Sequence, residues 1–288
     1  LLIKTIQNKK KTPYVEELEL KIEMLEKSGY DHFMLKEIFE QPRSIKDSMR
    51  GRLNAQKGWV SLGGIKDYLQ RVVNADRIII VACGTSWHAG LVGEYLFEDL
   101  ARVPVEVEYA SEFRYRNPII GEKDVVIAIS QSGETADTLA SVRAAKEHGL
   151  LTLGMVNVVG STIARETTAG VHNHAGPEIA VASTKAFISQ LTVLALSTLL
   201  LGRTRARLDA TAGAELVAAL ERLPHDIDAV LKTAPEIEAV AKQYAHYQHM
   251  MFIGRHAHAP IAAEGALKLK EVSYIHAEAY AAGELKHG

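Results

Sequence analysis

Short runs of aliphatic and β-branched residues alternate with helix-length segments through the middle of the chain. The runs are predicted strands at residues 77–83, 105–110, 124–130 and 150–157. Most of them are apolar at nearly every position, which is typical of parallel strands that are buried on both faces. With helix-length segments between most of them, the pattern predicts an α/β fold, a doubly wound parallel sheet flanked by helices. Such sheets bind ligands outside the carboxyl ends of their strands.

A later region of the chain repeats the beginning of this pattern. The sequences IVACGTSWHAG and MFIGRHAHAPIAAEG both run from an apolar strand through a glycine, Gly84 or Gly254, into a helix. A second pair of landmarks, EYASEFRY and YAAGELKH, keeps nearly the same offset of about 170 residues. We therefore predict one complete α/β unit and the start of a second, with roughly 90 residues of the second copy expected beyond this chain.

The repeat divides the chain into four expected regions. They are a lead-in with helices at 1–45, a first domain at 46–205, a helical connector at 206–240 and the truncated second domain at 241–288. Within the lead-in, residues 14–27 have the spacing of an amphipathic helix. Residues 32–53 predict another helix, which Pro42 bends or breaks.

Composition excludes several classes of protein. The 288 residues carry 33 basic and 35 acidic side chains, so a net charge of −2 gives no basic surface for nucleic acid or a membrane. No uninterrupted apolar run reaches the roughly 18 residues that a membrane span needs. The single cysteine, Cys83, excludes a disulfide framework and fits a cytoplasmic protein.

The sequence SQSGET stands between the third predicted strand and a helix. It offers hydroxyl groups from Ser130, Ser132 and Thr135 and an amide from Gln131, while Gly133 lets the backbone approach a ligand closely. Together with the unpaired N–H groups at the start of the helix, these donors suit a phosphate. The alternative is plain helix capping by serine and threonine. The number of donors in so short a stretch favours phosphate binding.

A turn after the first strand, CGTS, has a similar composition. Gly84 permits a tight turn, and Thr85 and Ser86 offer hydroxyl groups at the same edge of the sheet. Cys83 has no base close by in the sequence, so we interpret it as a packing residue rather than a nucleophile.

A third turn, VAST, precedes a long apolar helix and contains Val181 and Ser183. Ser183 or Thr184 is expected to cap that helix. Lys185 lies near the helix start, where its charge opposes the helix dipole. A functional role and a structural ion pair are both open for Lys185.

Titratable residues gather in the last predicted helix, at residues 261–275. At about 100° per residue, Glu264, Lys268 and Glu271 form a stripe along the edge of an apolar sector. A carboxylate and an ammonium group three residues apart on such an edge suit acid–base chemistry in a cleft. The alternative is a surface ion pair between Glu264 and Lys268, worth under about 0.5 kcal/mol. The apolar sector comprises Ile261, Gly265, Leu269 and Val272.

Four segments together resemble a known enzyme family. They are similar to segments of the sugar-isomerase (SIS) half of the glutamine–fructose-6-phosphate aminotransferases, and their sequences are CGTS, SQSGETADTL, VASTKAF and EGALKLKEVSYIHAEAYAAGELKHG. The similarity covers nearly all of residues 30–288. The resemblance implies the SIS fold and the synthesis of glucosamine 6-phosphate, the first committed step toward amino-sugar nucleotides. It implies that fructose 6-phosphate binds to Thr85, Ser86, Ser130, Gln131, Ser132, Thr135, Val181 and Ser183.

The resemblance also implies the catalytic groups. Glu271 would move a proton between C1 and C2 of the sugar, Lys268 would stabilise the enolate-like charge, and His287 would open the sugar ring. In the family this histidine is supplied across a dimer interface, so a homodimer is expected. The family's glutaminase domain and its C-terminal lysine are not in this sequence. No metal, nucleotide or flavin cofactor is expected, because this proton transfer needs only a base, an acid and an oxyanion stabiliser.

Two other functions are compatible with the fold. A non-catalytic SIS module that senses a phosphosugar would need SQSGET but no base, so Lys268 and Glu271 favour an enzyme. A Rossmann dinucleotide-binding domain would carry Gly-x-Gly-x-x-Gly after the first strand, where ACGTSW stands instead.

Overall fold

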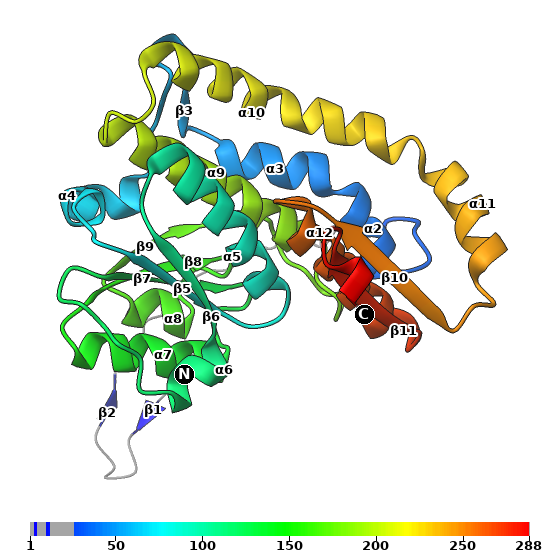
Figure 1. Cartoon of the computed structure of the whole chain (residues 1–288), viewed down its shortest axis with the longest axis horizontal. Helices are drawn as coiled ribbons and strands as arrows, with labels where there is room; N and C mark the ends of the chain where they lie inside the picture. Colours follow the sequence, from blue (N-terminus) through cyan, green and yellow to red (C-terminus); the bar gives the residue numbers. More distant parts are fainter. Residues whose placement is uncertain (1–2, 5–9, 12–25, 288) are drawn as a thin grey trace.

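A five-stranded parallel sheet forms the centre of the molecule (Figure 1). The computed structural model describes residues 3–4, 10–11 and 26–287. The strand order is β6-β5-β7-β8-β9, and every neighbouring pair is parallel. The strands are β5 Ile78–Ala82, β6 Val105–Tyr109, β7 Val125–Ser130, β8 Leu151–Val156 and β9 Ala169–His172.

The four predicted strands and the doubly wound fold are confirmed. Strand β9 was not predicted, because it is only four residues long and contains Gly170. That glycine lets the backbones of β8 and β9 approach closely, since a Cβ there would overlap the carbonyl oxygen of Gly154.

The direction of winding reverses at β5. This first strand lies between β6 and β7, so the chain adds strands on both sides of it. In open α/β sheets the crevice at such a switch point, beyond the carboxyl ends of the strands, is where ligands bind. The CGTS turn follows β5 and SQSGET follows β7, so both predicted donor turns lie at this crevice.

Helices cover both faces of the sheet (Figure 1). On one face, α5 Thr85–Leu96 and α9 Lys185–Thr204 pack on Ile78 and Ile80 of β5. On the other face, α6 Ala110–Tyr115, α7 Ala136–Glu147 and α8 Thr162–Glu166 enclose a second core that includes Ile79 and Val81. Successive residues of β5 therefore enter different cores, which explains why the strand is apolar at every position.

Helix α9 departs from the expectation that no segment is long and apolar enough for a membrane span. By length and composition alone its 20 residues pass that test, with a mean hydropathy of 1.5. Its most apolar window is 78% buried inside the protein, however. The apolar composition is thus explained by packing against the sheet, α3 and α5.

The predicted break near Pro42 is confirmed. Helix α2, Phe33–Phe39, ends at Glu40, and α3, Gln41–Met49, begins with Pro42 in its first turn, where the missing N–H costs no hydrogen bond. The amphipathic helix predicted at 14–27 lies outside the described residues except for its last two positions. Smaller elements are β1 Ile3–Lys4, β2 Lys10–Lys11, β3 Leu53–Asn54, η1 Ala55–Lys57, β4 Trp59–Val60, η2 Gly63–Tyr68, α4 Leu69–Val73 and η3 Phe97–Ala101.

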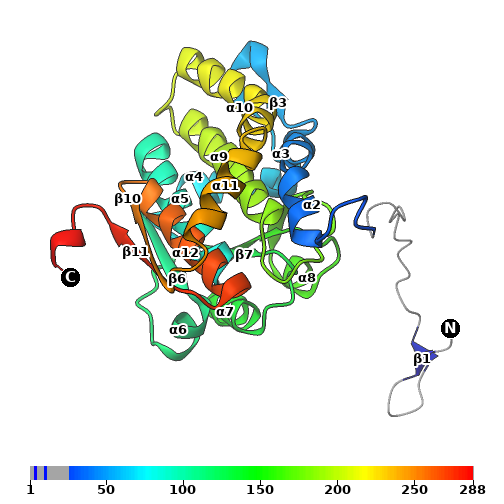
Figure 2. The same ribbon diagram turned by 90° about the vertical axis from the view of Figure 1, so that its right-hand side faces the viewer.

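The predicted start of a second α/β copy is also confirmed. After α10 Ala210–Leu231 and α11 Ala234–Tyr244, the chain forms β10 His249–Gly254, α12 His258–Ser273, β11 His276–Ala281 and η4 Leu285–His287. Strand β10 pairs in parallel with β11 as β5 pairs with β6. Helix α12 packs against α5, and Figure 2 shows this small unit beside the first sheet. The exact domain boundaries remain a prediction.

Candidate functional site

The loop between β7 and α7 is closed by its own hydrogen bonds. Gly133 N–H donates to Ser130 Oγ at 2.9 Å, and Ser130 Oγ lies 3.1 Å from Thr135 Oγ1. Gly133 has φ +67°, and a Cβ there would overlap Ser161 Oγ. The loop therefore requires glycine both for its backbone conformation and for its contact with Ser161.

The remaining loop residues hold its outer side. Ser132 Oγ accepts a hydrogen bond from Glu134 N–H at 3.2 Å, and the carboxylate of Glu134 accepts one from Thr162 N–H at 2.7 Å. Gln131, Ser132 and Thr135 are half-buried, so they are fixed yet accessible to a ligand. We call residues 130–135 the cradle.

Helices α5 and α7 both begin at the switch point without side-chain caps. The residue before α7 is Thr135 and the residue before α5 is Gly84, and neither accepts a capping hydrogen bond through a side chain. The capping alternative for SQSGET is therefore wrong, because the Thr135 hydroxyl lies beside Ser130 instead. Unpaired N–H groups and the positive ends of two helix dipoles favour an anion here.

Helices α5 and α12 bring an acid–base cluster together beside this crevice. Lys268 Nζ lies 2.5 Å from Glu271 Oε2 and 3.4 Å from Glu264 Oε1. It donates a hydrogen bond to Thr85 Oγ1 at 2.9 Å, and Thr85 in turn donates to Glu264 Oε1 at 3.0 Å. The predicted stripe of Glu264, Lys268 and Glu271 is thus present, and Thr85 completes it from the other domain.

The alternative of a Glu264–Lys268 surface pair is wrong. Glu264 is only 5% exposed, and His88 Nδ1 lies 2.7 Å from its Oε2. An ionised carboxylate only accepts hydrogen bonds, so the imidazole is the donor. Sequence reasoning missed His88, because its partner lies 176 positions away and nothing local marks the residue.

The predicted apolar sector of α12 is also wrong in part. Ile261 and Val272 are exposed, while the fully buried positions are Pro260, Ala262, Glu264 and Ala266. The buried face of the helix thus includes a carboxylate, whose hydrogen bonds with Thr85 and His88 offset the cost of removing it from water.

The two carboxylates beside Lys268 differ in accessibility. The side chain of Glu271 is 36% exposed, whereas that of Lys268 is 16% exposed and Glu264 is buried. Glu271 is therefore the carboxylate that a ligand can reach, and Glu264 holds the ammonium group from behind. This arrangement suits Glu271 as a base and Lys268 as a cationic partner.

The VAST turn lies across from Glu271. Val181 is fully exposed, and together with Ala180 and Ala182 it lines a hollow that Glu271 and Val272 also line. The predicted substrate residue Val181 thus shares an open surface with the predicted base.

The start of α9 differs from expectation. Thr184 is the N-cap residue, but it makes no side-chain capping bond. The carboxylate of Glu178 replaces it and accepts hydrogen bonds from the N–H groups of Thr184 and Ala186 at 2.8 and 3.1 Å, and from the Ser183 hydroxyl at 2.7 Å. A carboxylate is favoured there by the helix dipole. Lys185 is buried and donates to Glu40 Oε2 at 2.6 Å, which confirms the ion-pair interpretation.

Among the described residues, three other candidate side chains make no hydrogen bond with Glu264, Lys268 or Glu271. Ser86 is buried and its Oγ accepts a hydrogen bond from Gln190 Nε2 at 2.9 Å. Cys83 Sγ lies 3.9 Å from Thr138 Oγ1. His287 is exposed, and among the described residues its side chain has no hydrogen bond or ion pair with Lys268 or Glu271. No group of three His, Cys, Asp or Glu side chains suited to a metal ion occurs within the described part of the chain.

Comparison with known proteins gives a consistent set of matches. The model of the SIS domain family matches residues 72–200 and 243–288. A glutamine–fructose-6-phosphate aminotransferase [isomerizing] from Chlorobaculum tepidum is 54% identical over 99% of this chain, and the one from Bacteroides thetaiotaomicron is 53% identical over all of it. The chain covers 46% and 47% of these two proteins, so it spans about half the length of its curated relatives.

A solved structure agrees with these matches. The C-terminal domain of glucosamine-fructose-6-phosphate aminotransferase from Francisella tularensis superposes with a TM-score of 0.87 at 42% identity. The superposition covers 91% of this chain and 73% of that one.

Proposed function

The chain belongs to the SIS domain family and is similar throughout to the C-terminal part of glutamine–fructose-6-phosphate aminotransferases, and from that premise we propose that it binds fructose 6-phosphate and isomerises the ketose to the aldose. In the whole protein this step would be coupled to amination by ammonia that a glutaminase domain releases from glutamine. The product would then be glucosamine 6-phosphate, a precursor of amino-sugar nucleotides.

The position of Thr85 is the observation that supports the proposal most strongly. Thr85 is the first residue of α5, at the switch point beside the cradle, and its hydroxyl group also joins Lys268 to Glu264. The anion site and the acid–base cluster therefore meet at one residue. This is the arrangement that a sugar phosphate needs if its phosphate and its C1–C2 atoms are held at the same time.

The chemistry follows from the two sites. Hydroxyl and N–H donors of the cradle would hold the phosphate. The Glu271 carboxylate would take a proton from C1, the electron pair of that bond would form the C1–C2 double bond, and the negative charge on the C2 substituent would be stabilised by the Lys268 ammonium group. The hydroxyl proton on O1 would pass to O2 and shift the negative charge to O1. Return of the proton from Glu271 to C2 would then form the C1 aldehyde, so the transfer is complete without any cofactor.

A homodimer in the cytoplasm belongs to the proposal. His287 is exposed and, among the described residues, its side chain makes no hydrogen bond or ion pair with Glu271. This is expected of a residue that acts on the sugar ring in the site of a second subunit. Light scattering during gel filtration measures the mass directly, and a monomer at working concentration would contradict this part of the proposal.

Calorimetric titration of this chain tests substrate binding. We expect fructose 6-phosphate and glucose 6-phosphate to bind, and unphosphorylated fructose to bind far more weakly, because the cradle recognises the phosphate. If neither sugar phosphate bound, the result would contradict the proposal. Binding together with no isomerisation by the full-length protein would instead indicate a sensing module.

A further inference from the structure

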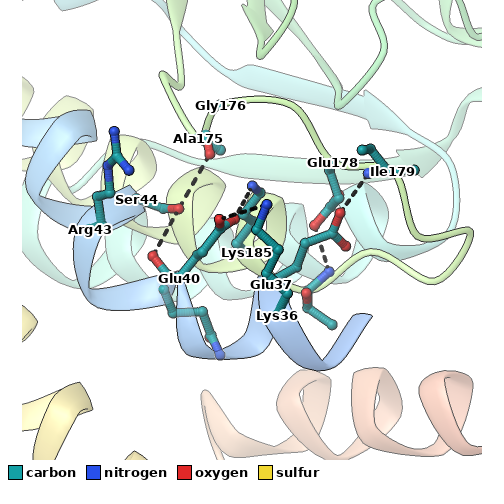
Figure 3. A network of polar contacts seen from close by, with 12 residues as sticks. Lys36, Glu37, Glu40, Arg43, Ser44, Ala175, Gly176, Glu178, Ile179 and Lys185 are labelled. Carbon is teal, nitrogen blue, oxygen red and sulfur yellow. Dashed lines mark hydrogen bonds and ion pairs between the residues drawn. The ribbon is translucent and has the colours of Figure 1, made fainter. Parts of the chain in front are cut away.

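The segment between β9 and α9 is held in place by the helices that precede the first domain. Glu37 of α2 is 2% exposed, and its Oε1 accepts hydrogen bonds from the N–H groups of Ile179 and Ala180 at 2.6 and 3.2 Å (Figure 3). These two residues immediately precede Val181. One carboxylate oxygen thus fixes the direction of two consecutive backbone amides.

A buried ion pair anchors α2 beside the start of α9. Lys185 Nζ donates to Glu40 Oε2 at 2.6 Å, and Lys36 Nζ lies 3.6 Å from the other oxygen of Glu40 (Figure 3). Both lysines are buried. Removal of Glu40 would leave the charge of Lys185 uncompensated inside the protein, so this ion pair fixes the end of α2 relative to α9.

The burial of the Glu37 carboxyl group carries a cost in desolvation free energy. Its Oε2 is buried without a hydrogen-bond partner among the described residues, and desolvation raises the pKa of the carboxyl group above its usual value. A neutral acceptor would satisfy the same two N–H groups at less cost. What the carboxylate adds is a stronger acceptor that orients both amides at once.

The loop that Glu37 holds faces the proposed base. Ala180, Val181 and Ala182 line the same hollow as Glu271, and helix α2 contributes Leu35 and Ile38 to its wall. On the other side of Val181, Glu178 fixes Ser183 through its hydroxyl group at 2.7 Å. The two carboxylates therefore hold the loop at both ends of its exposed stretch.

We propose that Glu37 is a positioning residue, which holds the loop at residues 179–183 so that Val181 and Ser183 meet the sugar opposite Glu271. The proposal rests on the function proposed above. It places the specificity for the sugar part of the ligand under the control of α2, while the cradle binds the phosphate without help from that helix.

Two conservative variants separate reach from charge at this position. Glu37→Gln keeps the length and the Oε1 acceptor, whereas Glu37→Asp keeps the charge and withdraws the carboxylate from the two amides. We expect Glu37→Asp to lower the affinity for fructose 6-phosphate by about tenfold and Glu37→Gln to lower it by less than about threefold, as measured by calorimetry. Binding of inorganic phosphate is expected to stay unchanged in both.

Ser44→Ala supplies the matched structural control. Ser44 is buried on α3, and its hydroxyl group contacts Ala175 O at 3.3 Å, in the same connecting segment but before the loop (Figure 3). This variant should lower the melting temperature without changing either affinity. Amide hydrogen exchange adds a readout independent of ligand, in which Ile179 and Ala180 exchange faster in Glu37→Asp than in Ser44→Ala.

The outcomes distinguish a failure of the role proposed for Glu37 from a failure of the proposed function. Two results in Glu37→Asp would overturn the role of Glu37 while leaving the proposed function in place. One is an equal loss of affinity for fructose 6-phosphate and inorganic phosphate, and the other is an unchanged affinity for both. Absence of fructose 6-phosphate binding by the unaltered chain would overturn the proposed function and this inference with it.

Discussion

The cradle and the acid–base cluster are assembled in opposite ways. The cradle consists of consecutive residues, 130–135, that hydrogen-bond mainly to one another. The cluster joins Thr85 and His88 of α5 to three residues of α12 that lie nearly 180 positions later. One site is a property of a loop, and the other is a property of the packing between two units.

This difference has a functional consequence. Local hydrogen bonds keep the cradle formed whenever β7 and α7 are folded, so the proposed phosphate site should persist when the second unit moves. The cluster exists only while α12 rests on α5, and it therefore responds to any movement of the second unit. Binding and proton transfer should consequently be separable by mutation.

The largest effect is expected at the base. Glu271→Gln removes the proton acceptor without changing its size, so isomerisation by the full-length protein should fall by about 10²–10⁴-fold. Affinity for fructose 6-phosphate should stay the same, because the cradle is untouched. A coupled assay of aldose formation measures the rate, and a variant with an unaltered rate would show that Glu271 is not the base.

A substitution in the cradle should instead lower the affinity for the sugar phosphate. Ser132→Ala combined with Thr135→Ala removes two hydroxyl donors to the phosphate, each worth about 1.5–3 kcal/mol to a charged group, so affinity for fructose 6-phosphate should fall by roughly 100-fold or more. Calorimetry with unphosphorylated fructose is the control. Similar weakening for both sugars would mean that the phosphate binds elsewhere.

A single methyl group tests how tightly the cradle is packed. Both Gly133 and Gly149 have positive φ values, +67° and +74°, but only at Gly133 would a Cβ overlap another residue, Ser161. Gly149→Ala should cost about 1 kcal/mol of unfolding free energy from backbone strain alone. Gly133→Ala should cost more and also weaken phosphate binding. Equal losses in chemical denaturation would show that the contact with Ser161 is unimportant.

The smallest effect on phosphosugar binding is expected from a group far from both sites. On the edge strand β6, burial and a hydrogen bond that the protonated Glu108 carboxyl group donates to Glu106 raise the pKa of Glu108 to about 7. Arg116 contacts both carboxylates, and Arg77 also pairs with Glu106. Since the folded state then binds this proton more tightly than the unfolded state, the unfolding free energy should decrease as pH rises from 4.5, the ordinary pKa of the carboxyl group, to about 7.

Replacement of the neighbouring charge checks that assignment. In Glu106→Gln the like charge beside Glu108 is gone, so the decrease in urea midpoint over this pH range should become shallower. Phosphosugar affinity should not follow Glu108 titration in either protein. An unchanged slope in Glu106→Gln would mean that another group titrates.

The contrast between the two sites also explains what the sequence could predict. Strands β5, β7 and β8 were predictable because burial on both faces leaves a continuous apolar run, whereas β9 is too short to carry that signal. The cradle was predictable because its residues are adjacent in the chain. The function proposed for it requires only a local loop and a helix start, both of which can be recognised in a sequence.

The cluster was predictable only in part. Helical periodicity placed Lys268 between Glu264 and Glu271, but it assigned the exposed residues Ile261 and Val272 to the interior. The burial of Glu264 and the contact with His88 depend on the docking of α12 against α5. Likewise, Glu178 replaces the expected cap of α9 because the preceding segment turns back toward that helix start.

Deuterium exchange tests most directly whether the two sites act on one molecule. In heavy water, the full-length protein should introduce deuterium at C1 or C2 of its hexose phosphates, as followed by NMR, because the proton on Glu271 exchanges with solvent before it returns. Unphosphorylated fructose should show far less exchange, and inorganic phosphate should inhibit competitively. Equal exchange into fructose and fructose 6-phosphate, unaffected by inorganic phosphate, would contradict the account.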